Sequence, residues 1–543
     1  MVQSVSREQV RMNPININRD DRTIAAIDLG TNSLHMVVVK INATLPAFTI
    51  IGREKDTVRL GDRDPKTGHL KPEIVERAIA TLGRFQEIAR SLNVEQIIAV
   101  ATSAVREAPN GRDFLKQIFT QLNLHVDLIS GREEARRIYL GVLSGMEFHQ
   151  KPHIIIDIGG GSTELILGDG DEPRFLSSTK VGAVRLTGEF VTTDPISNSE
   201  LKYLKAYIRG MMERAVDELQ ANLKPGEKPC MVGTSGTIET LAEIHAYETL
   251  GEAPSPITGY EISFADLEAT VNRLRKLSYK ERLEIEGMSD RRSEIIIAGA
   301  LVLQETMSML AIDSLTICSR ALREGTIVDW MLTHGLIEDK LRYQSAIRER
   351  SVLKIAQKYR VNLSSSERIA KFALTLFDQT YGILHDWDLN AKELLWAAAI
   401  LHNCGVYISH SAHHKHSYYL IRHGELLGYN ETDVEIIANL ARYHRKNSPK
   451  KKHDNYQNLN SKIDRKMVKQ LSAILRLAVA LDRREIGAIA ALDCDYHPKT
   501  AQLCLKLQPK KPNDDCILEL WSLEQKKAVF EEEYEVKVIA TLN

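Results

Sequence analysis

Two short stretches of the chain repeat one pattern of hydrophobic and polar positions. In the first, the apolar run TIAAIDL ends near Asp28, a polar turn follows, and a second apolar run begins at Leu34. In the second, HIIIDI ends near Asp157, and a new run begins near Glu164 after a glycine-rich turn. Each pattern predicts a β-hairpin with a tight polar loop. Because the pattern recurs, we expect two similarly folded lobes with a cleft between them.

Strands and helices are predicted to alternate around these hairpins. QIIAVATSAV is strand-like and leads to a predicted helix at about residues 113–122, and HVDLIS leads to the helical pattern EEARRIYLGVL. The second lobe continues through MVGTSGTIETLAEI and ends near LTICSRALREGTIVDWML. Such alternation is typical of α/β lobes.

The rest of the chain follows a different pattern. Strand signals disappear from about His334 to Ala490, where amphipathic segments such as ELLWAAAILHN and DVEIIANLARYH predict an all-helical domain. In the last stretch AQLCLKL and CILELWSL alternate as strands do, and EQKKAVFEEEYEVKVI is compatible with a helix, so we expect a small α/β domain. The polar start predicts a flexible extension. The expected segments are the extension 1–22, the lobes 23–145 and 146–332, the helical domain 333–490 and the C-terminal domain 491–543.

The composition excludes several classes of protein and partner but does not indicate a function. A chain of 543 residues exceeds a single compact core, and 43% hydrophobic and 26% charged residues are typical of globular proteins. The formal net charge of −1 predicts no overall attraction to nucleic acid or anionic membranes. The scattered cysteines indicate reduced thiols. Without a long apolar segment or a signal-peptide core, we expect a cytoplasmic protein with no membrane partner and no specific nucleic-acid partner.

Three loops of small residues are candidates for phosphate binding. Consecutive backbone N–H groups can surround an anion, and glycine permits its close approach. The third loop precedes the helical pattern IETLAEI, whose first N–H groups favour negative charge. An ordinary turn or a helix cap would explain any one loop, but three in one chain favour phosphate. The candidate residues are Asp28, Gly30, Thr31, Asn32 and Ser33; Gly159, Gly160, Gly161, Ser162 and Thr163; and Gly233, Thr234, Ser235, Gly236 and Thr237.

Carboxylates near these loops could hold a cation and accept a proton. Asp157 and Glu164 flank the second loop and are oxygen ligands suited to Mg²⁺. In SGREEARR, Ser130 and Glu133 fit a capping box at a helix start. Glu134 is thereby left to act as a general base toward water, although a favourable interaction with the helix dipole is the simpler alternative.

Several cationic side chains could contact phosphate. Arg106, at the end of a predicted strand, could bind phosphate oxygens or form only a surface ion pair, and the two arginines of SRALREG are equally ambiguous. A basic cluster after Tyr443 could hold a phosphate polymer with salt-sensitive affinity, or could be a solvated loop. The candidate polymer track comprises Arg445, Lys446, Lys450, Lys451 and Lys452, with Arg442 nearby.

Six motifs in order resemble the Ppx/GppA family of exopolyphosphatases and guanosine pentaphosphate phosphatases. They are DLGTNS, ATSAVRE, SGREEAR, DIGGGSTE, GTSGT and LREG, and the similarity extends from about Thr23 to Leu332. The family belongs to the sugar kinase, Hsp70 and actin superfamily. The resemblance therefore implies an α/β fold with two actin-like (ribonuclease H-like) lobes, and Mg²⁺-dependent release of phosphate from inorganic polyphosphate, guanosine pentaphosphate or both. It also implies a homodimer.

The resemblance further implies roles for individual residues. Glu134 resembles the catalytic base of the family, and Asp157 and Glu164 resemble its catalytic and metal-associated carboxylates. Residues 159–162 and the GTSGT loop resemble phosphate-binding loops, and Arg106 resembles a phosphate contact. Water deprotonated by Glu134 would attack the terminal phosphorus in line.

The helical region resembles the HD-type domain of long family members, in LHNCGVYISHSAHHKHSYYLI and LARYHRKNSPKKK. An HD phosphohydrolase needs a His-Asp pair on a metal, whereas His402 is followed by Asn403, so we expect no second metal-dependent active site. Nearby histidines could bind metal, but a polar surface between domains or in contact with phosphate is the favoured interpretation. They are His410, His413, His414 and His416.

Two other function classes stay open at this point. One is an ATPase or kinase of the same superfamily, because phosphate loops do not distinguish transfer to water from transfer to a substrate. The SGREEAR carboxylate favours water. The other is a non-catalytic sensor of guanosine pentaphosphate, against which the set Glu134, Asp157 and Glu164 argues. The sequence does not indicate whether polyphosphate or guanosine pentaphosphate is the preferred substrate, or which chain length is preferred.

Overall fold

The structure is a computed structural model, and it describes residues 22–42, 47–146, 148, 150–254, 257–336, 347–424, 426, 429, 431–459 and 461–542. The expected N-terminal extension lies outside the described residues, apart from Arg22. The chain divides into two compact units. The first comprises Met1–Val126 and Glu134–Ser345, and the second Asp127–Glu133 and Ala346–Asn543.

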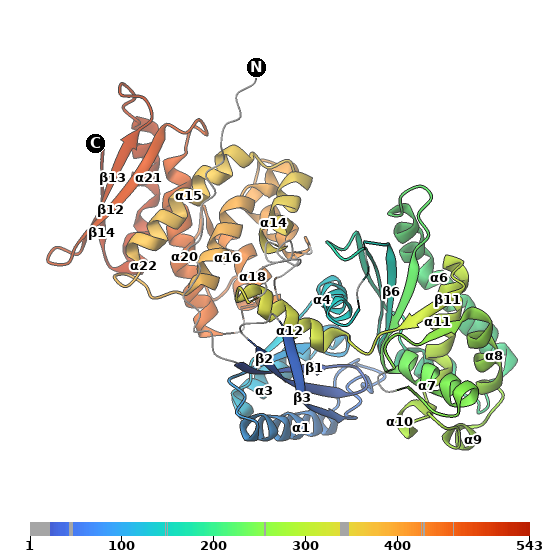
Figure 1. The fold of residues 1–543 in the computed structure, drawn as a ribbon. Coiled ribbons are helices and arrows are strands. Elements are labelled where there is room, and N and C mark those ends of the chain that lie inside the picture. Colours follow the sequence, from blue (N-terminus) through green and yellow to red (C-terminus); the bar gives the residue numbers. More distant parts are fainter. Residues whose placement is uncertain are drawn as a thin grey trace. The chain divides into compact units, whose positions relative to one another are not determined.

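The first lobe contains a five-stranded sheet in the order β3-β2-β1-β4-β5 (Figure 1). The predicted hairpin is confirmed, because β1 and β2 pair antiparallel with Asp28 opposite His35, while β4 adds to β1 in parallel. The helix expected at residues 113–122 is also present. The elements are β1 (Arg22–Leu29), β2 (Leu34–Asn42), β3 (Ala47–Asp56), α1 (Pro72–Ser91), β4 (Gln96–Ala101), α2 (Ser103–Glu107), α3 (Gly111–Leu122), β5 (Val126–Leu128) and α4 (Gly131–Leu143).

The second lobe contains a six-stranded sheet in the order β10-β11-β9-β6-β7-β8. Its predicted hairpin is confirmed as well, with Asp157 opposite Glu164 in the antiparallel pair β6–β7. All six residues of β7 are buried, as expected for a strand inside an α/β lobe. The strands are β6 (His153–Ile158), β7 (Thr163–Gly168), β8 (Phe175–Thr179), β9 (Cys230–Thr234), β10 (Glu261–Ser263) and β11 (Ser314–Ile317).

Helices α7 and α10 of the second lobe carry residues of the candidate active site. Helix α11 packs against α5, α6, α7 and α8 and is buried along most of its length. The short helices α9 and α10 precede α11. The helices are α5 (Ala183–Phe190), α6 (Asn198–Ala221), α7 (Gly236–Leu250), α8 (Phe264–Leu274), α9 (Tyr279–Leu283), α10 (Asp290–Ser293) and α11 (Ile296–Leu310).

Helix α12 (Leu322–Thr333) follows the second lobe in sequence but packs against the sheet of the first lobe. Its side chains Ile327 and Trp330 share a hydrophobic core with Ile24 of β1. A close approach between α12 and α4 depends on Gly325, since a Cβ there would overlap the carbonyl oxygen of Arg137. This helix therefore joins α4, which carries Glu134, to the sheet of the first lobe.

All the elements described between Ile347 and Leu481 of the second unit are helices, as the loss of strand signals in the sequence predicted. Its core is built from aliphatic and aromatic residues such as Phe372, Leu395, Ile437 and Leu471. Of the helices in the described part of the chain, none combines the length and hydropathy needed to cross a bilayer. The elements are α14 (Ile347–Lys358), α15 (Leu363–Thr380), α16 (Leu389–Leu401), the 3₁₀ helix η1 (Cys404–Tyr407), α17 (His413–Arg422), α18 (Glu431–Tyr443), α19 (Asp454–Gln457) and α20 (Lys462–Leu481).

The C-terminal segment has a three-stranded sheet and two helices, but one strand prediction was wrong. AQLCLKL lies in a strand, whereas CILELWSL forms most of a helix. Its buried residues Cys516, Glu519 and Leu523 recur every three or four positions, which is the period of a helix. The end of the segment read as helix-compatible is instead a strand that pairs in parallel with its neighbour. The elements are β12 (Ile489–His497), β13 (Gln502–Pro509), α21 (Ile517–Lys526), α22 (Ala528–Tyr534) and β14 (Lys537–Leu542).

Candidate active site

The two hairpin loops have the same local geometry and lie against each other. In the first, the N–H of Gly30 donates to the carbonyl of Ser33 at 3.2 Å, and in the second the N–H of Gly159 donates to the carbonyl of Ser162 at 2.9 Å. A Cβ on Gly161 would lie 2.8 Å from Oγ1 of Thr31. Only glycine therefore permits this approach, and the first two predicted phosphate loops are brought together.

The side-chain hydroxyls of Thr31 and Ser103 lie beside the place where the two loops contact each other. Thr31 of the first loop and Ser103, at the start of α2, lie 3.0 Å apart through their side-chain oxygens, and both are buried. The Oγ of Ser103 would also lie 2.7 Å from a Cβ on Gly161. Ser103 was not among the predicted site residues, although it belongs to the ATSAVRE motif.

Buried carboxylates gather beside the two loops. Asp157 and Glu164 are 8% and 1% exposed and face each other across β6 and β7. Burial, followed by repulsion from Glu134, raises the pKa of both carboxyls well above their usual values. Burial likewise raises the pKa of Asp28 to about 7, again with Glu134 adding repulsion. The hydroxyl of Ser178 donates to Glu164 at 2.7 Å.

Glu134 lies on α4 and forms a partly buried ion pair with Arg106. The Nη1 and Nη2 atoms of Arg106 lie 3.3 and 3.4 Å from Oε2 of Glu134. Burial raises the pKa of Glu134, and Arg106 opposes that shift. The expected capping contact is present nearby, because the N–H of Glu133 donates to the hydroxyl of Ser130 at 3.2 Å. Arg106 itself is not at a strand end, since β4 ends at Ala101 and Arg106 lies in the short helix α2.

The third glycine-hydroxyl loop connects β9 to α7 and lies beside Asp157. Strand β9 pairs with β6 so that Thr234 is opposite Asp157. Ser235 has a φ of 106°, a conformation that costs energy in a residue with a Cβ, and its hydroxyl accepts from the N–H of Ile238 at 3.5 Å. All three predicted loops therefore converge on one group of carboxylates.

Three charged residues of this region were missed or left ambiguous by the sequence. Glu239, in the first turn of α7, is half-buried, and burial raises its pKa while Arg323 opposes the shift. Arg292 covers the third loop, because a Cβ on Gly236 would overlap its guanidinium. The position of Arg323 in LREG was visible in the sequence, whereas no pattern singled out Glu239 or Arg292.

The two arginines of SRALREG have different surroundings. Arg323 interacts electrostatically with Asp28 and Asp157, and its Nη1 lies 3.3 Å from Nδ1 of His35. Arg320 instead donates to the hydroxyl of Ser144 at 3.1 Å and lies over the ring of Phe48. Arg323 thus belongs to the charged group around the loops, and Arg320 holds neighbouring segments together.

The charge balance of this region suits a divalent cation. Glu134, Asp157 and Glu164 are buried, and Asp28 and Glu239 are partly buried. Burial raises the pKa of all five carboxyls, and repulsion from neighbouring carboxylates adds to the rise for Asp28, Asp157, Glu164 and Glu239. Within the described part of the chain, Oδ1 of Asp28 is buried without a hydrogen-bond partner. No group of three or more His, Cys, Asp or Glu among the described residues is arranged to hold a metal ion. The unpartnered carboxylate oxygen of Asp28 is of the kind that a hard cation such as Mg²⁺ takes as a ligand.

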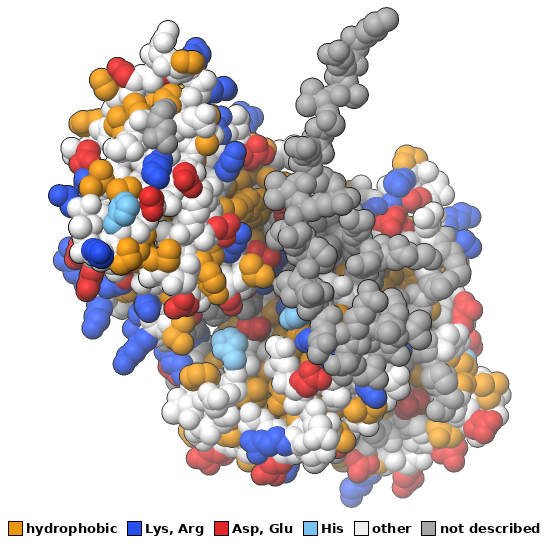
Figure 2. Space-filling view, turned by 60° about the vertical axis from the view of Figure 1, so that its left-hand side comes forward, with side chains coloured by type: hydrophobic (Ala, Val, Ile, Leu, Met, Phe, Trp, Pro, Cys, Tyr) orange, Lys and Arg blue, Asp and Glu red, His pale blue; other side chains and the backbone are white. Residues whose placement is uncertain are grey.

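The candidate polymer track belongs to the second unit. Lys446, Lys450, Lys451 and Lys452 are exposed between α18 and α19. Arg445 is half-buried, and its Nη1 lies 3.1 Å from Nδ1 of His413. On the face of this unit seen in Figure 2, Lys and Arg side chains are numerous, with acidic side chains among them.

Five histidines of the second unit have ring contacts with one another, namely His402, His410, His413, His414 and His444. His402 is buried, with Nδ1 2.7 Å from the carbonyl of Ala399, and burial lowers its pKa to about 4. His413 stacks on His444 with ring centroids 5.4 Å apart. His410 is exposed and His416 half-buried, so the four histidines predicted as a possible metal cluster are divided between surface and interior.

Comparisons with known proteins agree with this arrangement. The sequence model of the Ppx/GppA phosphatase family matches residues 37–334, more than half of the chain, and that of Ppx/GppA phosphatase, domain III, matches residues 347–527. A crystal structure of the Ppx/GppA family member of Aquifex aeolicus is 27% identical, with a TM-score of 0.50, and the match covers 58% of this chain and 99% of that one. An exopolyphosphatase from Cytophaga hutchinsonii ATCC 33406 is 26% identical, with a TM-score of 0.54, over 58% of this chain and 98% of that one.

Proposed function

Because the chain belongs to the Ppx/GppA phosphatase family and is thereby a phosphohydrolase, we propose that it releases terminal orthophosphate from inorganic polyphosphate, guanosine pentaphosphate or both. The observation that carries this proposal is the convergence of three loops on the buried carboxylates Asp157 and Glu164, with the Glu134–Arg106 pair beside them. The similarity to the Cytophaga exopolyphosphatase supports the class of substrate.

In the proposed reaction Glu134 is the general base. It accepts a proton from water as the water oxygen bonds to the terminal phosphorus and the bond to the bridging oxygen breaks. Burial raises the pKa of Glu134 toward the range in which a carboxylate is an effective base, and Arg106 limits that shift so that the ionised form stays available. Orthophosphate leaves, and the remaining chain is one unit shorter.

Phosphate oxygens would be held by the loops and by Arg106. The backbone N–H groups of the two hairpin loops and of the third loop at the start of α7 are the proposed donors, and the helix end adds favourable charge. Arg106 would stabilise the negative charge that develops on the terminal group. The glycines at 160 and 161 let the second loop pack closely against Thr31 of the first loop, so that both loops lie at one place.

Asp157 and Glu164 are the pair that we propose for Mg²⁺, with Asp28 near them. Their raised pKa values and the unpartnered Oδ1 of Asp28 support a cation in this place. When bound, Mg²⁺ would neutralise charge on the phosphate oxygens.

The second unit is proposed to hold the substrate rather than to cleave it. Arg445, Lys446 and the lysines at 450–452 would bind a long phosphate chain, which would allow several cleavages for each binding event. We further propose that the helical domain is HD-like without a second active site, since Asn403 follows His402. We also propose that the protein is cytoplasmic and forms a homodimer.

A phosphate-release assay tests this function. Polyphosphate and guanosine pentaphosphate are compared at equal concentration, with and without Mg²⁺, for the parent chain and for Glu134→Gln. We expect Mg²⁺-dependent orthophosphate release from at least one substrate and its loss in the variant. Binding without release would favour a sensor, and transfer of phosphate from ATP to an acceptor would favour a kinase.

A further inference from the structure

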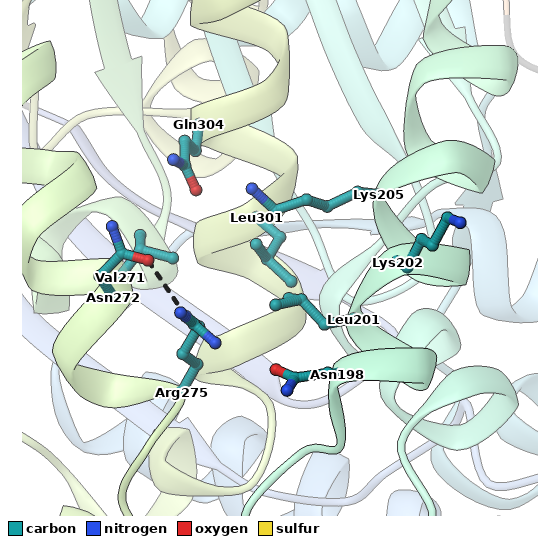
Figure 3. Close-up of a pocket in the computed structure, with 9 residues that line it drawn as sticks. All are labelled: Asn198, Leu201, Lys202, Lys205, Val271, Asn272, Arg275, Leu301 and Gln304. Atoms are coloured by element: carbon teal, nitrogen blue, oxygen red, sulfur yellow. Dashed lines mark hydrogen bonds between the residues drawn. The ribbon is translucent and has the colours of Figure 1, made fainter.

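Two cavities on the second lobe contact helix α6, and their linings carry opposite charge. The cavity drawn in Figure 3 is lined by Lys202, Lys205 and Arg275, and no described residue of its lining is acidic. The second cavity, which we call the aromatic groove, has a volume of about 470 Å³, within the range of small-molecule sites. Its described lining has two carboxylates and no cation. The lining includes Glu189, Phe190, Thr192, Glu200, Tyr203 and Tyr207.

Three aromatic rings line the aromatic groove, and all are accessible from solvent. Tyr203 and Tyr207 lie four positions apart on α6 and so share one face of the helix, while Phe190 ends α5. The rings of Phe190 and Tyr207 contact each other, with centroids 4.7 Å apart. Both are half-buried, and Tyr203 is 69% exposed. Because none of the residues that line the groove is buried, a ligand could reach them without any change in the fold.

The two carboxylates of the groove have different surroundings. In Glu200, Oε1 accepts from the N–H of Thr192 at 2.7 Å and Oε2 accepts from the N–H of Ser197 at 2.9 Å. Side-chain hydrogen bonds, the largest contribution being from Thr193, hold the pKa of Glu200 below its usual value. Glu189 is exposed and, within the described part of the chain, forms no hydrogen bond or ion pair. Glu200 is therefore a fixed negative charge, and Glu189 is a carboxylate that can bind a ligand directly.

The combination of rings and carboxylates favours an organic cation. The face of an aromatic ring carries partial negative charge and attracts ammonium groups, and methylene groups can pack on the same rings. Two carboxylates without a cation in the described lining favour a ligand with more than one positive charge, rather than a single quaternary ammonium group.

We propose that the aromatic groove binds a linear aliphatic polyamine. One ammonium group would donate to the carboxylate of Glu189, and another would lie near the fixed charge of Glu200. The methylene groups between them would pack on the rings of Phe190, Tyr203 and Tyr207. The site shares no residue with the candidate active site, and the proposal does not depend on the proposed hydrolysis.

Calorimetric titration of the full chain tests the proposal, in Mg²⁺-free buffer at low salt. Phosphate polymers are left out, because they would bind polyamines themselves. The probes are spermidine and choline, which differ in the number of positive charges. We expect saturable binding of one spermidine per chain and weaker binding of choline. Glu189→Gln/Tyr203→Leu should weaken spermidine binding by about 10-fold or more, since it removes an ion pair and a cation–π contact.

Two controls separate this groove from other acidic sites. Glu213→Gln/Phe119→Leu makes the same kinds of change at exposed residues outside the groove, and Glu164→Gln alters the candidate metal pair. Both should bind spermidine as the parent chain does. The proposal is overturned if spermidine binding does not saturate, if choline binds as tightly as spermidine, if both double variants lose the same affinity, or if only Glu164→Gln abolishes binding.

Discussion

Arg106 and Glu134, 28 residues apart in sequence, form an ion pair with 3.3 Å between Nη1 and Oε2. The pair joins α2 to α4 next to the two hairpin loops. Because Glu134 is buried, its ionised form depends on this partner, and removing the charge of Arg106 would raise the pKa of Glu134 further.

Glu134→Gln should lower turnover by about 10²-fold or more while substrate binding and folding are retained, because an amide cannot accept the proton from water. The kcat for phosphate release measures this. Glu133→Gln is the matched control. Glu133 is also a buried glutamate of α4, and its backbone N–H donates to the hydroxyl of Ser130. If Glu134→Gln kept normal turnover, Glu134 would have no part in the reaction.

Asp157→Asn and Glu164→Gln should each raise the Mg²⁺ concentration needed for half-maximal activity, because each removes an anionic ligand. Excess chelator should abolish phosphate release by the parent chain. Glu305→Gln, which alters a buried glutamate on α11 that pairs with Lys205, should leave the Mg²⁺ dependence unchanged. Full activity in chelator would contradict the assignment of a metal.

Asp28→Asn should stabilise the Mg²⁺-free chain at pH 8 and have little effect at pH 4. The pKa of Asp28 is raised from 3.8 in the unfolded chain to about 7 in the folded one. Folding is therefore penalised as pH rises through this window, with the full penalty above pH 7, and the substitution removes it. Thermal unfolding at the two pH values measures the difference, and an equal change in Tm at both would refute the prediction.

Gly325→Ala should destabilise the first unit by about 3 kcal/mol or more, because the added methyl group would overlap the carbonyl oxygen of Arg137 and separate α12 from α4. Gly210→Ala in α6 is the control, since nothing lies within 4 Å of its Cβ position. That change should stabilise the chain by about 0.5–1 kcal/mol. Denaturant unfolding measures the free energy of unfolding of both variants, and so distinguishes the effect of the overlap from the effect of losing a glycine.

Neutralising Lys450, Lys451 and Lys452 to glutamine should weaken binding of long polyphosphate and flatten its salt dependence, since fewer counterions are displaced. Short substrates should be affected little. The control neutralises Lys499, Lys510 and Lys511, which are also exposed on the second unit. Equal losses for short and long substrates would place the lysines at 450–452 in folding or catalysis instead.

Local pattern alone determined much of this protein. The two hairpins were predictable because their strands and turns are adjacent in sequence, and the spacing of Ser130 and Glu133 predicted a cap that is present. The order of six short motifs indicated the family, which the match of the family model over residues 37–334 shows.

Which residues from distant parts of the sequence lie close together depends on the tertiary structure. Arg323 and Arg320 lie three positions apart in one motif, yet Arg323 interacts with Asp28 and Asp157 while Arg320 contacts Ser144. Likewise CILELWSL is a helix because its face with Leu523 packs inward, whereas its alternation suggested a strand. Short windows carry local periodicity, but electrostatic partners and packing faces depend on segments that are far apart in the chain, and these are set only when the lobes fold.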